Sequence, residues 1–332
     1  MSRGIRVMQI GLGPLGQMIS PYLSERTNIE ICAAVDIDPG MEGQDLGELC
    51  SISAVSNVRI TSNLERAVQT EPQVAVITTV SKVREILPLI ESVVPQGIHV
   101  VSTCEELTYP WLTNPDVASQ IDEVAKRNNA CVLGTGVNPG FLMDFLPTAA
   151  TAVCRDIDAI LIERIQDASF RRLPFRQKIG AGLSEDEFRG KAAEGKIRHV
   201  GLTESMHMIA SKLGWDVDRT EDIVEPVLAG EKVKGEDWLV EAGMATGVNQ
   251  IGRAFSGDKE VLTLVFRACV GEKEPRDRVK IHGTPEVDLT IAGGVNGDIA
   301  TCAIITNAVA AVCDAPPGLR TMVDMPPLSC LR

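Results

Sequence analysis

Two adjacent carboxylates, Glu105 and Glu106, follow an apolar run that ends in Ser102, Thr103 and Cys104. A carboxylate at the end of a buried strand can take a proton from an amine, activate water and stabilise a cationic imine. The same pair can also be two charges on a solvated loop, and the residues alone weigh these interpretations evenly. Because adjacent residues on an extended chain face opposite ways, we expect only one of the two acids to point inward.

A glycine-rich turn lies near the start of the chain. Gly11, Gly13 and Gly16 follow a strand-like run in G-x-G-x-x-G spacing. The first glycine permits a tight turn, the second lets the backbone approach a pyrophosphate, and the third lets helix and strand pack closely. The next such run ends at Asp36, 20 residues beyond Gly16, where a carboxylate can accept ribose hydroxyls. The predicted cofactor contacts in this turn are Gly11, Leu12, Gly13, Pro14, Leu15 and Gly16.

Asp36 indicates which dinucleotide the turn favours. Its negative charge repels the 2′-phosphate of NADP, and the following Ile37, Asp38 and Pro39 bring no arginine to offset it. We therefore expect NAD to be the preferred cofactor, without excluding NADP. The alternative is a glycine-rich turn in another βαβ protein that binds no dinucleotide.

The elements that must position these residues alternate between strand and helix patterns over the first 140 residues. The predicted strands are 5–11, 29–36, 57–61, 73–80, 97–103 and 130–135. They are apolar on both faces, which predicts an α/β fold with an N-terminal Rossmann domain built on a doubly wound parallel sheet. Ligands bind beyond the carboxyl ends of such strands. The polar residues predicted there are Thr78, Thr79, Ser102 and Asn138 for the cofactor, and Thr135 with Asn138 for the substrate.

After residue 140 the pattern changes to longer alternating runs, at 156–166, 199–205, 260–272, 278–283 and 286–294. They predict an α+β domain with a mixed or antiparallel sheet. Ser184 and Glu187 form a capping box that opens a helix, and an apolar helix from Asp298 ends before two prolines. The predicted domains are 1–140, which binds the dinucleotide; 141–296, for substrate binding and dimerisation; and 297–332, a helix and tail that pack back on the Rossmann domain.

Composition argues against several classes of function. The formal net charge of -13 over 332 residues disfavours nucleic acid, whose binding needs clustered Lys and Arg. The nine cysteines contain no C-x-x-C pair, which indicates reduced thiols. We find no signal peptide, no metal-ligand spacing and no apolar run of the roughly 18 residues that a membrane span needs. We expect a cytoplasmic protein without a metal, membrane or nucleic-acid partner.

A second group of polar residues lies in the second half of the chain. Arg164 and Gln166 share one face of a strand-like run by the period-2 rule. The cationic loop that follows contains Arg171, Arg172, Arg176 and Lys178. In an acidic protein such a loop suggests a site for a substrate carboxylate or a cofactor phosphate. A solvated loop or a subunit contact explains it equally well. Of the four histidines, His199 is the best candidate for chemistry, since it enters a polar segment just before a glycine.

The chain resembles the 2,4-diaminopentanoate dehydrogenase family, which includes the native amine dehydrogenases and is related to dihydrodipicolinate reductase. The resemblance covers nearly the whole chain. It lies in "GLGPLG", "VDIDPG", "STCEELTYPW", "GTGVNPGFLMD", "QDASFRRLPFRQKIGAG", "GKIRHVGLTES" and "APPGLRTMVDMPP". It implies a Rossmann domain, a substrate domain that forms a dimer interface, and reversible NAD(P)-dependent oxidative deamination. It also implies that a glutamate of the Glu105–Glu106 pair is catalytic.

The resemblance further implies which residues meet the substrate. Asn138 and Phe141 line the cofactor and substrate cleft, and Arg164 and His199 meet the carboxylate of an amino-acid substrate. Gln166 stands where some relatives have Asn. The predicted substrate contacts are Thr135, Asn138, Phe141, Arg164, Gln166 and His199.

The predicted activity follows from the resemblance. It is removal of the C4 amine of 2,4-diaminopentanoate to give 2-amino-4-oxopentanoate and ammonia, by a homodimer. The alternative is a broader amine dehydrogenase that acts on aliphatic amines, ketones and aldehydes. A sensor that binds the cofactor without turnover is an alternative of another class.

Overall fold

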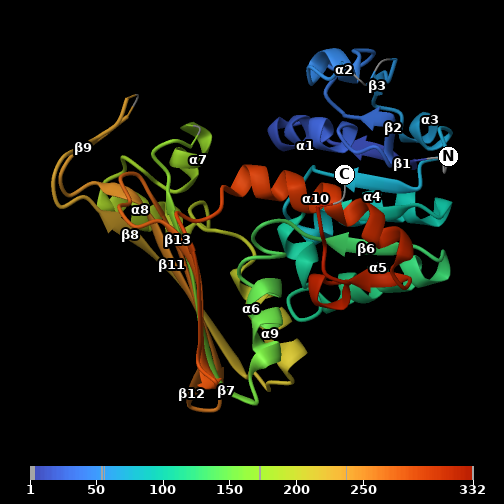
Figure 1. The fold of residues 1–332 in the computed structure, drawn as a ribbon. Coiled ribbons are helices and arrows are strands. Elements are labelled where there is room, and N and C mark those ends of the chain that lie inside the picture. Colours follow the sequence, from blue (N-terminus) through green and yellow to red (C-terminus); the bar gives the residue numbers. More distant parts are fainter. Residues whose placement is uncertain (1–3, 54, 56, 172, 237, 331–332) are drawn as a thin grey trace. The chain divides into compact units, whose positions relative to one another are not determined.

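The structure is a computed structural model and describes residues 4–53, 55, 57–171, 173–236 and 238–330 (Figure 1). The chain divides into two compact units. Unit 1 comprises Met1–Phe141 and Asn296–Arg332, and unit 2 comprises Leu142–Val295. The divisions fall within one residue of the boundaries drawn from the sequence at 140 and 296.

Unit 1 contains a seven-stranded parallel sheet in the order β15-β6-β5-β4-β1-β2-β3. Its strands are β1 (Ile5–Ile10), β2 (Ile29–Val35), β3 (Ile60–Thr61), β4 (Val74–Ile77), β5 (His99–Ser102), β6 (Cys131–Gly134) and β15 (Gly318–Arg320). The strand order reverses between β1 and β4, which is the switch point where open α/β sheets bind ligands. The central strands are buried on both faces, and β4 is buried along its whole length. The predicted Rossmann architecture is confirmed.

The helices of unit 1 pack on this sheet. They are α1 (Pro14–Ser24), α2 (Leu46–Leu49), α3 (Leu64–Val68), α4 (Val83–Val93), α5 (Pro115–Arg127) and α10 (Gly297–Asp314). Helix α10 contacts α1, β4, β5 and β6. In the described chain, α10 is the one helix long and apolar enough to cross a membrane, with a mean hydropathy of 1.3. The expectation that no such run exists was therefore wrong. Length and composition are weak evidence for a span, because core helices share them, and α10 buries residues such as Ile305 and Val309.

Unit 2 contains a six-stranded sheet in the order β14-β13-β7-β12-β11-β8. Its strands are β7 (Asp156–Asp167), β8 (Arg219–Leu228), β11 (Ala245–Ser256), β12 (Lys259–Cys269), β13 (Arg276–Thr284) and β14 (Val287–Ala292), with a separate hairpin of β9 (Val233–Lys234) and β10 (Leu239–Val240). The helices are α6 (Phe145–Ala150), α7 (Leu173–Lys178), α8 (Glu185–Ala193) and α9 (Leu202–Leu213). Strands β7 and β12 are parallel and the other neighbours are antiparallel, so the sheet is mixed, the first of the two arrangements that the sequence predicted.

Helix α9 covers one face of this sheet, against β8, β11 and β12 (Figure 1). Met206 and Ile209 of α9 pack there in one apolar core with Ile162 and Leu264 of the sheet. The opposite face consists of the alternate strand residues, such as Ile251, and is only partly buried within the described chain. The sheet therefore presents one covered and one open face.

The sequence predicted the start of helix α8 correctly but misassigned or missed some strands. The capping box of Ser184 and Glu187 is confirmed at the start of α8. The run 199–205 was predicted as a strand, and this was wrong. Its first residues form a loop, Gly201 takes a left-handed φ of 107°, and α9 begins at Leu202. Strands β8, β11 and β15 were not predicted.

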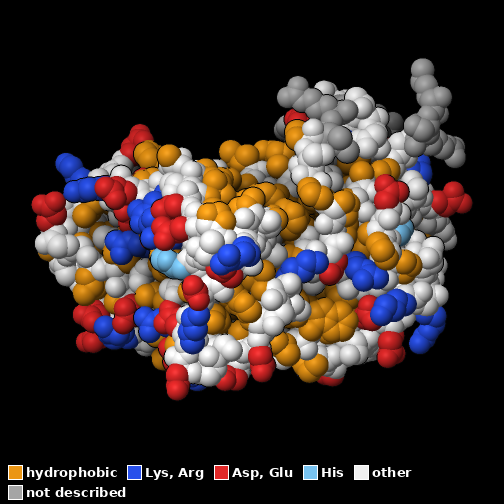
Figure 2. Space-filling model, turned by 60° about the horizontal axis from the view of Figure 1, so that its bottom comes forward, with side chains coloured by type: hydrophobic (Ala, Val, Ile, Leu, Met, Phe, Trp, Pro, Cys, Tyr) orange, Lys and Arg blue, Asp and Glu red, His pale blue; other side chains and the backbone are white. Residues whose placement is uncertain are grey.

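Charges of both signs are mixed on the face of the molecule that Figure 2 shows. On the face shown in Figure 2, Lys and Arg side chains alternate with Asp and Glu side chains, and apolar side chains lie between them. The net charge of -13 is therefore not gathered into one acidic patch on that face.

Candidate active site

The glycine-rich turn joins β1 to α1 at the centre of the parallel sheet. Gly11 has a φ of 88°, which favours glycine, and its N–H donates to Val35 O at 2.8 Å. A Cβ on Gly16 would overlap the carbonyl oxygen of Gly11, whereas a Cβ on Gly13 would meet no described heavy atom within 4 Å. The third glycine is thus needed for packing, and the second faces the open space that a pyrophosphate requires.

The start of α1 supplies backbone donors beside this open space. Pro14 occupies the first helical turn and has no N–H. The N–H groups of Leu15 and Gly16 come next, and first-turn N–H groups have no acceptor inside their helix. Leu12 is fully buried and its N–H donates to Asp36 at 2.6 Å. Leu12 therefore supports the turn through its backbone, which does not test its predicted contact with the cofactor.

Asp36 lies directly after β2 and is half-buried. Its Oδ2 accepts the Leu12 N–H, and its Oδ1 accepts the N–H of Asp38 at 2.8 Å. Each carboxylate oxygen can accept a further hydrogen bond. Asp36 can therefore fix the glycine-rich turn and still accept ribose hydroxyls.

A buried amide supports the turn from below, and the sequence analysis missed it. Gln9 is fully buried in β1, and its Nε2 donates to Gly11 O at 2.9 Å and to Thr78 Oγ1 at 3.0 Å. The Thr78 hydroxyl donates to the same Gly11 oxygen at 2.8 Å. Thr78 thus holds the turn in place. The only sequence signal for Gln9 was a polar residue inside an apolar strand.

The two adjacent glutamates have different surroundings. Both belong to a short 3₁₀ helix, Glu105–Thr108, that follows β5. Glu106 Oε2 accepts the N–H of Val83 at 3.0 Å, at the N-terminus of α4, where the side chain of the N-cap residue Lys82 forms no capping hydrogen bond. A carboxylate there satisfies an orphan donor and interacts favourably with the helix dipole. Glu106 is therefore a helix-capping residue.

Glu105 does not cap a helix within the described chain. Within the described chain its carboxylate forms no hydrogen bond or ion pair, and its side chain is half-buried. It follows the carboxyl end of β5, two strands from β1 in the sheet. Burial raises the pKa of the preceding Cys104 thiol to about 12, so that neighbour stays neutral. Glu105 is the member of the pair that is available to a ligand.

Ser102 is the last residue of β5 and is buried. Its side chain is 1% exposed, and its hydroxyl donates to Ile77 O and accepts the N–H of Cys104, both at 3.1 Å. These bonds tie β5 to β4 and to the 3₁₀ helix. The contact of Ser102 with the cofactor stays a prediction.

Four other predicted residues lie at strand ends of unit 1. Thr79 is exposed after β4. Thr135 follows β6 and is 2% exposed, and its Oγ1 has no hydrogen-bond partner among the described residues. Asn138 and Phe141 are half-buried on the loop beyond it. Their contacts with ligands stay predictions.

In unit 2, Arg164 lies on β7 and is 1% exposed. Its Nη1 donates to Asp277 Oδ1 at 2.6 Å, and its Nη2 donates to Val295 O at 3.2 Å. With the Gln166 amide in its satisfied orientation, Gln166 Oε1 accepts Nε at 2.6 Å and Nη2 at 2.9 Å. Burial lowers the pKa of Arg164 and Asp277 opposes that shift. Arg164 thus lies beside Gln166, as predicted, in a cluster that also contains an acid the sequence did not reveal.

His199 is held by two residues that were not predicted. Gln250 is fully buried; its Oε1 accepts the His199 N–H at 2.6 Å, and its Nε2 donates to His199 O at 3.1 Å. The imidazole stacks on Phe266 with ring centroids 4.3 Å apart. Phe266 pairs with Arg164 in the register of β12 and β7. His199 and Arg164 therefore flank the same aromatic ring, while Glu105 belongs to unit 1.

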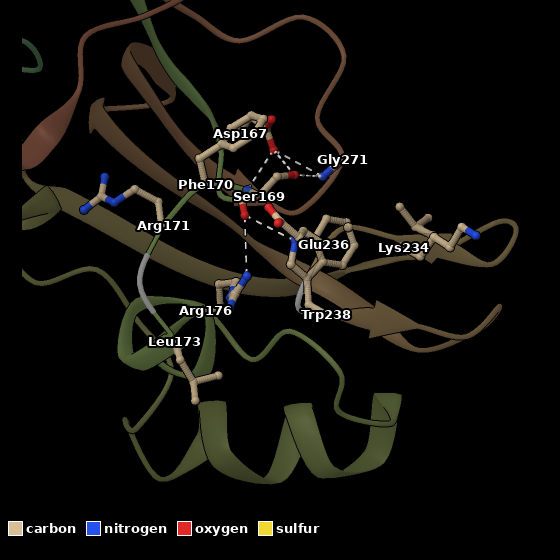
Figure 3. A pocket seen from close by; sticks show the side chains of 12 residues that line it. Asp167, Ser169, Phe170, Arg171, Leu173, Arg176, Lys234, Glu236, Trp238 and Gly271 are labelled. Carbon is tan, nitrogen blue, oxygen red and sulfur yellow. Dashed lines mark hydrogen bonds between the residues drawn. The ribbon is translucent and has the colours of Figure 1, made fainter.

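The cationic loop borders a cavity of about 590 Å³ in unit 2 (Figure 3). Arg176 is 5% exposed and donates to Ser169 O at 3.5 Å, and the Trp238 indole donates to the same oxygen at 3.2 Å. The Arg171 guanidinium lies 4.1 Å from the centre of the Phe175 ring. Lys178 is exposed, and Arg172 lies outside the described residues. Arg176 thus forms a hydrogen bond within the cationic segment. Anion binding by this segment stays a prediction.

Comparisons with known proteins identify the family of the chain and its fold. The model of the 2,4-diaminopentanoate dehydrogenase C-terminal domain matches residues 141–332. The chain is 28% identical over 330 residues to 2,4-diaminopentanoate dehydrogenase of Acetoanaerobium sticklandii, covering 97% of this chain and 93% of that protein. It is 22% identical to an amine dehydrogenase of Streptomyces virginiae, covering 95% and 94%. The solved amine dehydrogenase of Mycobacterium smegmatis has the same fold, with a TM-score of 0.84 at 21% identity, covering 99% and 98%. The chain belongs to the 2,4-diaminopentanoate dehydrogenase family.

Proposed function

We propose that the protein is an NAD(P)-dependent amine dehydrogenase. It removes the C4 amine of 2,4-diaminopentanoate to give 2-amino-4-oxopentanoate and ammonia, and in reverse it catalyses reductive amination. The observation that carries this proposal is Glu105, an uncommitted carboxylate at the carboxyl end of β5 in a Rossmann sheet. The relative from Acetoanaerobium sticklandii bears the name of this activity and supports the choice of substrate.

The residues of unit 1 fit a nicotinamide dinucleotide. The open space at Gly13 admits a pyrophosphate, the N–H groups of Leu15 and Gly16 can bind it, and Asp36 can accept ribose hydroxyls. When bound, the cofactor would accept a hydride from the carbon that carries the amine.

Glu105 handles the protons of the reaction. It takes a proton from the substrate ammonium and passes it to solvent water, because only the neutral amine has the lone pair that drives hydride loss. The regenerated carboxylate then stabilises the cationic imine by its negative charge. It next accepts a proton from the water that adds to the imine carbon. It returns this proton to the nitrogen of the carbinolamine and takes up the hydroxyl proton as the carbinolamine collapses to ketone and ammonia.

The test is a substrate panel with purified enzyme. We expect NADH formation from 2,4-diaminopentanoate with a kcat/KM at least tenfold above that for pentan-2-amine, which has the same reacting end without the amino-acid group. Equal or greater efficiency with pentan-2-amine would support the broader amine dehydrogenase instead. That second candidate is favoured by the buried Asp277, which offsets the charge of Arg164. No turnover with any amine, despite tight NAD binding, would contradict both.

We propose that NAD is preferred over NADP because of Asp36. Replacing Asp36 by serine should lower the ratio of kcat/KM with NAD to that with NADP at least tenfold, since the charge that repels a 2′-phosphate is lost. Asp38→Ser is the matched control, because Asp38 is an exposed acid two residues away. An unchanged ratio in Asp36→Ser would contradict the assignment.

We propose that the enzyme is a homodimer through the open face of the unit 2 sheet. Ile223, Ile251 and Val265 pair in register on three adjacent strands and form an apolar row on that face. Exposed apolar side chains in unit 2 also include Phe170, Leu173, Leu228 and Leu239. Such a row costs free energy in water, and a second copy of the sheet can cover it.

Sedimentation distinguishes the outcomes. The natural protein should be a dimer, and Ile251→Asp should shift it to monomer. Val153→Asp, which adds the same charge at a 67% exposed site, should leave the dimer intact. A monomeric natural protein, or an Ile251→Asp variant that stays dimeric, would contradict this interface.

We also propose a cytoplasmic location. All nine cysteines are free, from the buried Cys104 to the exposed Cys330. Free thiols persist in reducing compartments.

A further inference from the structure

The open face of the unit 2 sheet has an apolar half and an ionic half. The apolar row of Ile223, Ile251 and Val265 crosses β8, β11 and β12. In register on the next two strands, the same row continues with Glu163 of β7 and Arg278 of β13. These positions alternate with those that pack against α9, so their side chains lie on the open face. A protein surface that covers the whole row must therefore meet charged groups as well as apolar ones.

The charged groups of the ionic half form a cluster around Glu163. Its Oε1 accepts Arg276 Nη2 at 2.9 Å, and its Oε2 accepts Arg278 Nη1 at 3.4 Å. Arg278 also donates to both carboxylate oxygens of Asp288, at 2.8 Å from Nε and 2.6 Å from Nη2. We call this group the ionic cluster, and it consists of Glu163, Arg276, Arg278, Asp288 and the neighbouring pair of Lys280 and Glu286, whose charged atoms lie 3.6 Å apart.

The ionic cluster is balanced in charge, although the chain as a whole is not. Its three cations and three carboxylates sum to a net charge of zero, whereas the chain carries -13. The Glu163 side chain is 13% exposed, and those of Arg276 and Arg278 are 28% and 29% exposed. A surface that meets its own copy across a two-fold axis must carry no net charge, because like charges would otherwise face each other. The cluster therefore fits a second copy of this chain better than a partner of strong single-sign charge.

We propose that the ionic clusters of two copies face each other in the homodimer, and that Glu163 is the residue whose charge permits this contact. The inference rests on the proposed homodimer through the open face. A two-fold axis along the shared row brings apolar side chains against apolar side chains and cluster against cluster. Without the Glu163 charge, Arg276 and Arg278 lose their common acceptor, and each copy brings one uncompensated positive charge to the interface. Salt screens such partly buried charges poorly, so the two copies repel each other at short range.

Two single variants and their combination test the charge balance, with the Kd of the dimer measured by sedimentation over a concentration series. Glu163→Gln leaves one excess positive charge in each cluster and Arg276→Gln leaves one excess negative charge, and each should raise the Kd at least tenfold. The double variant is neutral again and should have a Kd within threefold of the natural value. Asp158→Asn is the control, because it removes the acid of an exposed ion pair near the start of the same strand, with Lys259, and should leave the Kd unchanged. A double variant as weakly associated as the single variants would overturn the proposal.

Mixing the two single variants tests whether the clusters meet across the axis. Glu163→Gln and Arg276→Gln should form a mixed dimer with a Kd at least fivefold below that of either variant alone, because an excess positive charge then faces an excess negative one. A mixture that associates no better than the separate variants means that the cluster acts only within one copy, which overturns the proposal. If Glu163→Gln does not fold, Asp288→Asn takes its place, since Asp288 is 44% exposed and its loss also leaves one excess positive charge.

The same measurements separate this inference from the proposed homodimer. A natural protein that is monomeric overturns the homodimer and this inference with it. A natural dimer whose Kd is unchanged in Glu163→Gln overturns this inference alone, and the homodimer through the apolar row stands.

Discussion

Replacing Glu105 and Glu106 one at a time separates chemistry from helix capping. Glu105 has no partner within the described chain, whereas Glu106 accepts the Val83 N–H at the start of α4. Removal of a general acid–base residue typically lowers the rate by about 10² to 10⁴. We therefore expect Glu105→Gln to lower kcat by that factor with an unchanged Tm, because no bond that holds the fold is lost.

Glu106 should respond in the opposite way. The loss of a side-chain cap costs about 0.5–2 kcal/mol, and a charge at a helix N-terminus adds about 0.3–1 kcal/mol. In a unit of this size, 1 kcal/mol shifts Tm by about 2–4 °C. Glu106→Ala should therefore lower Tm by several degrees. Its kcat should stay within about threefold of the natural value, since its carboxylate is bonded to the Val83 N–H and is not the proposed acid–base group.

The assay measures NADH formation at saturating amine together with thermal unfolding of the same preparations. Glu106→Gln is an intermediate control, because it keeps an acceptor for the Val83 N–H and loses only the charge. Full activity in Glu105→Gln would refute the proposed mechanism. A Glu106→Gln variant as inactive as Glu105→Gln, with an unchanged Tm, would mean that the two roles are reversed.

Three further predictions address the cofactor turn, His199 and a buried thiol. Gly13→Ala should weaken NAD binding at least tenfold in a fluorescence titration, because its methyl group enters the open space that the pyrophosphate needs, and its Tm should not change. Gly16→Ala should weaken NAD binding and also lower Tm, because its methyl group overlaps the backbone carbonyl of Gly11. Gln250→Leu should raise the KM for the amine several-fold and change kcat little, since it removes both hydrogen bonds to the His199 backbone. Gln250→Glu keeps the acceptor for the His199 N–H, so its KM should lie between those of the natural enzyme and Gln250→Leu. The same KM in Gln250→Leu and the natural enzyme would contradict the role of Gln250 in positioning His199. The pKa of Cys104, raised by burial to about 12, keeps its thiol protonated, so iodoacetamide at pH 9 should label the exposed Cys330 and leave Cys104 unmodified. The same shift stabilises the fold fully below pH 9 and progressively less as pH rises toward 12, so Tm should fall in that window.

The glycine-rich turn could be predicted from the sequence because its parts are close together in the chain. Three glycines within six residues define the turn by sterics alone, and Asp36 follows at a spacing set by one helix and one strand. The alternating apolar runs likewise predicted the parallel sheet. The sequence is sufficient to predict a feature when its interacting residues are close together in the chain.

Other features depended on partners that are distant in sequence. Asp277 and Arg164 are 113 residues apart, and Gln250 and His199 are 51 apart, so no local pattern connects them. Strand β11 was missed because "ATGVNQIGRAFS" contains glycines and polar residues, and its neighbours β8 and β12 make it a strand. The different roles of Glu105 and Glu106 could not be predicted from the sequence, because they depend on where the N-terminus of α4 lies.

The uncommitted carboxylate of Glu105 matches the charge of the reacting amine. The reacting end of the substrate is cationic as ammonium and again as protonated imine, and Glu105 opposes that charge at both stages. The far end of the substrate takes no part in these proton transfers. A change of charge at the far end should therefore alter KM without altering the proton transfers at Glu105. On this argument, the pH dependence of kcat should be the same for 2,4-diaminopentanoate and pentan-2-amine once the different pKa values of the two amines are taken into account. A difference beyond that would mean that the charges at the far end of the substrate take part in the chemistry itself.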